Sequence, residues 1–95
     1  DEERRVSALQ AIGKIAQVRP DLLNKLPLYL IPLLKDPDYR ARGYAAWMLG
    51  YLGTEEIKED LEGLFGDTRQ IGIYRNGTLK MKTLDEIARE AIDRL

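Results

Sequence analysis

The strongest constraint on the fold is an internal repeat with a period of about 37 residues. Placing Gly13 on Gly50 brings charged, small and apolar residues into register. The matching pairs are Arg5 with Arg42, Ala8 with Ala45, Ala11 with Met48, Ile12 with Leu49, and Ile15 with Leu52. Ala88, Ala91, Ile92 and Leu95 extend the pattern into a third copy. Helix pairs at this period predict an all-α, short α-solenoid of about two and a half pairs.

Apolar periodicity and chain-breaking residues divide the chain into elements within one domain, residues 1–95. We expect helices at 2–18, 21–35, 37–52, 54–65 and 84–94, with Pro27 dividing the second and Asp36 capping the third. Thr83 and Glu86 form a capping box before the last helix. Two core stripes follow from spacings of three and four. They are Ala8, Ala11, Ile12 and Ile15 in the first helix, and Ala41, Ala45, Met48, Leu49 and Leu52 in the third.

Between the last two helices the apolar period changes to two, which predicts an inserted β-hairpin at 69–82. Asn76-Gly77 tolerates the positive φ angles of a type I′ turn. This turn sets Tyr74 opposite Leu79 and Gly72 opposite Met81, so one face of the hairpin is apolar. The other face carries Ile71, Ile73, Arg75, Lys80 and Lys82.

The composition argues against catalysis. The chain has no cysteine and no histidine, so it lacks thiol nucleophiles, imidazole bases and the usual zinc ligands. Its 15 basic and 16 acidic residues give a net charge of −1, which is not the charge of a polyelectrolyte. We therefore expect a non-catalytic binding protein with no cofactor and no metal.

Location follows from equally simple features. The longest apolar stretch, 26–34, is short and holds two prolines, and the chain opens with three acidic residues rather than a signal peptide. We expect a cytoplasmic protein without a membrane partner. The absence of cysteine and the scarcity of amides favour a thermophile. The missing initial methionine suggests a piece of a longer protein.

Residues 33–53, LLKDPDYRARGYAAWMLGYLG, resemble HEAT-like repeats, most closely the type named after phycobilisome lyases and common in prokaryotes. The resemblance implies pairs of antiparallel helices, with the second helix of each pair lining a concave side. Asp36 and Arg42 match an Asp and an Arg that tie the inter-helix turn to the second helix. Arg5 matches the same Arg and Asp67 the same Asp, so that ladder is whole only once. No residue here matches a bilin-lyase catalytic group or the His-Glu iron ligands of HEAT-type hydroxylases.

The resemblance also implies a concave partner-binding face. The candidate residues there are Lys14, Arg40, Trp47, Tyr51 and Arg94. An exposed tryptophan would have the chemistry of an interface anchor. The alternative is that Trp47 and Tyr51 pack between neighbouring helices.

A second candidate surface is the basic hairpin, which carries Arg69, Arg75, Lys80 and Lys82. These cations could reach phosphates or an acidic protein, or they could protect the exposed strand edges from pairing with other chains. Three hypotheses therefore stay open. The leading one is a protein or peptide partner on the concave face. The second is nucleic acid bound through the hairpin with Arg4, Arg5 and Lys14. The third is a purely structural module that self-associates through its open end.

Overall fold

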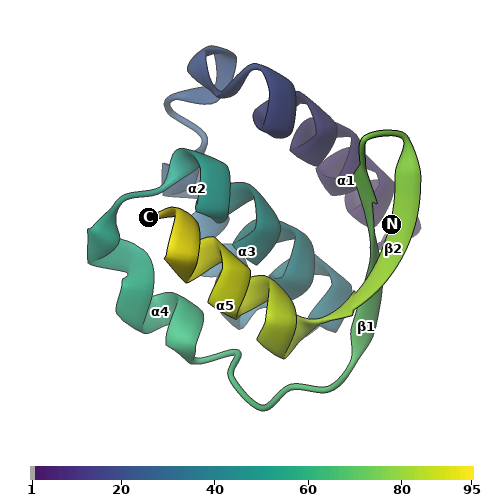
Figure 1. The fold of residues 1–95 in the computed structure, drawn as a ribbon, viewed down its shortest axis with the longest axis vertical. Helices are drawn as coiled ribbons and strands as arrows, with labels where there is room; N and C mark the ends of the chain where they lie inside the picture. The colour runs from purple at the N-terminus through teal and green to yellow at the C-terminus, as the bar shows by residue number, and fades with distance from the viewer. Residues whose placement is uncertain (1) are drawn as a thin grey trace.

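The computed structural model describes residues 2–95, apart from the side chains of Leu22 and Leu23. Besides short 3₁₀ segments, the described part of the chain contains five α-helices and one antiparallel hairpin. They are α1 (Glu2–Val18), α2 (Pro27–Leu30), α3 (Tyr39–Leu52), α4 (Lys58–Glu62), β1 (Gln70–Arg75), β2 (Thr78–Thr83) and α5 (Leu84–Arg94). The helices α1, α3 and α5 lie side by side, with α4 at the left of the view and the hairpin at the right (Figure 1). None of these helices has the length and apolarity needed to cross a membrane.

Prolines break up the segment expected to be helical at 21–35. It folds as a 3₁₀ turn η1 (Pro20–Leu23), the single turn α2, and a second 3₁₀ segment η2 (Ile31–Lys35). Pro27 opens α2, where a missing amide hydrogen costs little, whereas Pro32 lies inside η2. The helix expected at 54–65 is similarly reduced to η3 (Glu55–Ile57) followed by α4.

The start of α3 differs from the expectation. Asp38, not Asp36, is the N-cap residue, because its carboxylate accepts a hydrogen bond from the Arg40 amide at 2.9 Å. The Asp36 carboxylate instead accepts from the Asp38 amide at 2.9 Å. Asp36 and Asp38 thus each accept a hydrogen bond from the backbone amide two residues further on. The helix begins at Tyr39 rather than at residue 37.

Helix α3 is the centre of the core. Every residue from 41 to 50 except Arg42 is buried, because α1 and α5 flank the helix and the hairpin lies across another of its faces. A Cβ atom at Gly50 would lie 2.9 Å from the Ala91 Cα, so glycine permits the close approach of α3 to α5. In the predicted stripe of α3, Leu52 is half-buried and the other four residues are buried, and Gly43 and Trp47 on the opposite face are buried as well.

Helix α1 presents a different face to the core from the one predicted. Val6, Leu9, Gly13 and Ala16 are buried, whereas Ala8, Ala11 and Ile15 are exposed. The physical reason is the large ring of Trp47 on α3. A Cβ atom at Gly13 would lie only 2.3 Å from that ring, so the indole occupies the space above the glycine.

The hairpin has the expected turn and register. Asn76 and Gly77 have φ angles of 52° and 76°, and Tyr74 pairs with Leu79 and Gly72 with Met81. The face described above as apolar does not turn toward the helices. Leu79 and Met81 are exposed, while the face that carries Ile71 and Ile73 turns toward the helices.

Candidate functional site

Strand β1 covers the face of α3 that was expected to be open. Ile71 fills the space beside Gly43, where an added Cβ would lie 2.6 Å from the Ile71 Cδ1. One residue further along each element, the Tyr44 hydroxyl donates a hydrogen bond to the Gly72 carbonyl at 2.8 Å. The hairpin therefore takes up much of the surface where a partner was expected to bind.

Trp47, the expected centre of the partner-binding face, is buried in this arrangement. Its side chain is 3% exposed, and its ring centroid lies 6.1 Å from that of Tyr44. Of the two interpretations made from the sequence, the structure favours packing between elements. Trp47 is part of the core and does not present an anchor on the surface.

An open groove remains between the tip of the hairpin and the C-terminal halves of α1 and α3. Its wide part has a volume of about 720 Å³ and is lined by Lys14, Gln17, Val18, Tyr51, Tyr74, Arg75, Asn76 and Gly77. A narrow extension of about 40 Å³ shares Gln17, Tyr51 and Arg75 with it and adds Trp47, Ile73, Lys80, Lys82, Glu90 and Arg94. We call these two neighbouring spaces together the hairpin groove.

Two tyrosines organise the cations of the hairpin groove. The Lys14 Nζ lies 4.1 Å from the centroid of the Tyr74 ring, and the Arg94 guanidinium lies 4.5 Å from that of Tyr51. The Tyr51 hydroxyl also accepts a hydrogen bond from the Gln17 Nε2 at 3.3 Å. Cation–π contacts thus hold Lys14 and Arg94 against the groove wall without neutralising their charge.

The hairpin groove carries an excess of positive charge. Within residues 2–95, no carboxylate forms an ion pair with Lys14, Arg75, Lys80 or Arg94. Lys82 differs, since its Nζ donates to both carboxylate oxygens of Glu90, with 2.7 Å to Oε2. The groove is therefore suited to a ligand that brings negative charge.

The other cations singled out from the sequence lie away from the groove. Arg40 binds Glu3 at 2.7 Å and Asp38 at 3.0 Å, beside the start of α3. Arg69 binds Asp67 at 2.8 Å, and its guanidinium lies over the Tyr39 ring. Both are paired with carboxylates, and neither lines the groove, so the groove brings together only some of the partner-binding candidates and hairpin cations.

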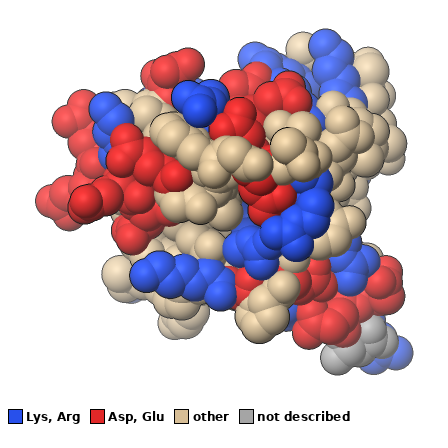
Figure 2. All heavy atoms as spheres, turned by 90° about the horizontal axis from the view of Figure 1, so that it is seen from below, with Lys and Arg blue, Asp and Glu red and all other residues tan. Residues whose placement is uncertain are grey.

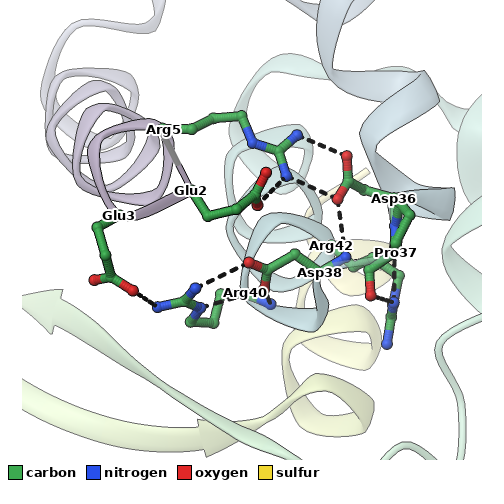
Figure 3. Close-up of polar contacts among 8 residues, drawn as sticks. All are labelled: Glu2, Glu3, Arg5, Asp36, Pro37, Asp38, Arg40 and Arg42. Carbon is green, nitrogen blue, oxygen red and sulfur yellow. Dashed lines mark hydrogen bonds and ion pairs between the residues drawn. The ribbon is translucent and has the colours of Figure 1, made fainter.

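Asp36 and Arg42 belong to a polar network at the opposite ends of α1 and α3 (Figure 3). The Arg42 Nη1 donates to the backbone carbonyl of Asp36 at 2.7 Å. The Asp36 carboxylate is bound by Arg5 on α1, at 2.7 and 2.9 Å. In the same way, Arg42 reaches Asp67 at 3.5 Å. Arg5 therefore binds Asp36, which follows η2, and Arg42 binds Asp67, which follows α4. The match of Arg5 to Arg42 in the sequence could have revealed this relation.

These contacts lower the pKa values of the acids. Hydrogen bonds from Arg5 hold the pKa of Asp36 below its usual value of 3.8. Hydrogen bonds from Arg40 lower the pKa of Asp38 to about 2, and those from Arg69 lower that of Asp67 to about 2. At neutral pH these aspartates are therefore charged and paired with arginines. Such pairs stabilise the structure and are not suited to proton transfer.

A second charged region lies over η3 and α4. Its exposed acids are Glu55, Glu56, Glu59, Asp60 and Glu62. Acidic side chains gather on this side of the molecule when it is seen from below, while acids and bases alternate elsewhere on that face (Figure 2). Among residues 2–95, no group of three or more acidic side chains has the arrangement of a metal site. This patch is a solvated face at the start of a short helix.

Comparison with known families identifies the chain at the level of its repeat. The family model of the HEAT-like repeat matches residues 2–52, which is more than half of the chain. The chain belongs to the HEAT-like repeat family, whose members generally mediate protein interactions. Searches against curated proteins and against solved structures found no significant match.

Proposed function

We propose that this chain is a non-catalytic scaffold that binds a segment of a partner protein in the hairpin groove. The family supports protein interaction in general. The observation that carries the choice of face is the open space of about 720 Å³ beside unpaired cations and tyrosine side chains. The proposal replaces a broad concave surface centred on Trp47 with the part of that surface that the hairpin leaves open.

We propose further that the helices form a short solenoid of the phycobilisome-lyase type. In this arrangement α1, α3 and α5 are the second helices of successive repeats, and α2–η2 and η3–α4 are the first. The 37-residue match between α1 and α3 supports this arrangement. Glu3 and its partner Arg40 are 37 residues apart in the sequence, so equivalent positions of the two helices lie in contact. The equivalent arginines Arg5 on α1 and Arg42 on α3 also bind Asp36 and Asp67, the carboxylates that follow η2 and α4.

The groove supports binding better than chemistry. The chain holds no cysteine or histidine, and the carboxylate of Glu90, which lines the narrow extension, is bound by Lys82. Nucleic-acid binding through the hairpin with Arg5 has weaker support. Arg5 is bound to Asp36, Arg69 to Asp67 and Lys82 to Glu90, so these three cations are already neutralised.

The proposal is tested with an array of short peptides of mixed acidic, basic and neutral composition. We expect a subset to bind saturably, and the Val18→Trp variant to weaken their binding by about tenfold by filling the groove. The matched control is Leu28→Trp, because Leu28 is as exposed as Val18 and lies outside the groove. An array without saturable binding, or binding that Val18→Trp leaves unchanged, would show that the groove is not the binding site.

A further inference from the structure

We infer that the occupant of the hairpin groove is an acidic peptide segment in which carboxylate side chains alternate with aliphatic ones. This inference rests on the proposed function and deepens it. It begins from the unpaired cations. Four positive charges gathered around one space repel one another, and a bound anion removes that repulsion.

The cations are distributed along the groove rather than gathered at a point. Lys14 lines the wide part, Lys80 and Arg94 line the narrow extension, and Arg75 lines both. They also come from three elements: α1, the hairpin and α5. A single small anion would contact only some of them, whereas an extended segment with successive carboxylates can contact cations in both parts.

The remaining lining groups fit a polypeptide. The side-chain amides of Gln17 and Asn76 can bond to main-chain groups of an extended segment. Val18 contributes an aliphatic wall and is 75% exposed. An aliphatic side chain that lies between two acidic ones along the segment would cover that wall and bring its neighbours to the cations.

The geometry favours a peptide over a nucleic acid. Single-stranded nucleic acids stack their bases on open aromatic faces and contact many phosphates. Here Lys14 lies over one face of Tyr74 and Arg94 over one face of Tyr51. Lys82 in the narrow extension and Arg69 outside the groove are both bound by acids, so the free cations do not continue as a track along the hairpin.

The test uses the full chain and three fluorescent probes: a short peptide that alternates Glu and Leu, the same peptide with Gln in place of Glu, and a single-stranded oligonucleotide. We expect the Glu-Leu peptide to bind with an affinity that falls as salt is added, and at least about tenfold more tightly than the Gln-Leu peptide. Charge removal by R75Q with K80Q should weaken the Glu-Leu peptide about tenfold. The matched control, K25Q with K35Q, removes two exposed lysines outside the groove and should leave binding unchanged.

Each outcome decides the inference. Equal binding of the Glu-Leu and Gln-Leu peptides, or equal loss in the two double variants, would overturn it. Tighter binding of the oligonucleotide would assign the groove to nucleic acid. If the mixed array binds only neutral or basic peptides, the scaffold proposal stands and the acidic specificity falls. If the array binds nothing, the scaffold proposal itself fails. Unchanged circular dichroism of the variants shows that folding is not the cause.

Discussion

Arg5 on α1 binds both carboxylate oxygens of Asp36, which directly follows η2, at 2.7 and 2.9 Å. The bond joins the first helix to the turn before α3, across 31 residues of sequence. A bidentate pair of this kind fixes orientation as well as distance. Arg5 therefore ties the start of α1 to the turn before α3 in a defined orientation.

Removing the charge of Asp36 tests this role. We expect Asp36→Asn to lower the free energy of unfolding by about 1 kcal/mol, because it removes the negative charge that faces the Arg5 guanidinium and one of its two acceptor oxygens. Urea unfolding followed by Trp47 fluorescence measures the change. The control is Asp21→Asn, whose pair with Arg19 is exposed on both sides and should contribute little to stability. Equal effects in the two variants would contradict a special role for the Arg5–Asp36 pair.

The same network makes stability depend on pH in the acid range. Asp38 and Asp67 have a pKa of about 2 in the folded protein, below the ordinary value of 3.8. Their stabilisation is therefore fully present above pH 3.8, and it is lost as the pH falls toward 2. We expect the melting temperature to fall over this interval, and to fall less in the Asp38→Asn, Asp67→Asn double variant. A double variant with the wild-type slope would assign the acid sensitivity to other carboxylates.

Gly50 is expected to tolerate no side chain. Alanine ordinarily stabilises a helix interior by about 1 kcal/mol relative to glycine. At Gly50 the added methyl would meet the backbone of Ala91 at 2.9 Å, which only a shift of α5 can relieve. We expect Gly50→Ala to destabilise the protein by about 1–3 kcal/mol in chemical denaturation. Gly63→Ala is the control, since Gly63 is exposed with a helical φ of −61°, and it should cause no comparable loss.

The hydroxyl of Tyr44 attaches the hairpin to α3. Tyr44→Phe removes the 2.8 Å bond to the Gly72 carbonyl and keeps the ring in the core. We expect a loss of about 1 kcal/mol and faster amide hydrogen exchange in β1 and β2. Tyr29→Phe is a matched control, because Tyr29 is 74% exposed. Exchange that quickens equally in the hairpin and in α5 would indicate global destabilisation instead.

Trp47 provides a direct check on the burial of the predicted concave face. As the single tryptophan, 3% exposed, it should emit at a blue-shifted wavelength and resist quenching by acrylamide. In urea the emission should shift to the red as the indole meets water. Emission typical of exposed indole in the native protein would contradict the packing of the hairpin on α3.

Local chemistry made several features predictable. Asn76-Gly77 specifies its turn because few residue pairs tolerate two positive φ angles, and Thr83 with Glu86 forms the expected capping box. The turn then fixes the strand register. The family was equally accessible, since the residues around Asp36 and Arg42 carry its pattern. Each of these features depends on residues close together in sequence.

Faces that depend on distant neighbours were harder to predict. Ile15 belongs to an apolar stripe, yet it is 46% exposed, whereas Gly13 is buried because Trp47 lies on it. The apolar periodicity of one helix gives glycine no weight, and it carries no information about an indole that packs from another helix. Likewise Ile71 and Ile73 turn inward although lysines lie opposite them, because Gly43 leaves room for an isoleucine from the hairpin. The groove was not predictable, since it exists only where the hairpin stops covering α3.

The turn at Asn76 and Gly77 lies at the mouth of the groove and outside the core. Both residues are exposed, and an added Cβ at Gly77 would have no neighbour within 4 Å. Surface turns of this kind accept longer loops without loss of the underlying fold. The hairpin tip is consequently an interchangeable part. Grafted loops at this position could give the same helical frame new binding preferences, with recognition and stability altered independently.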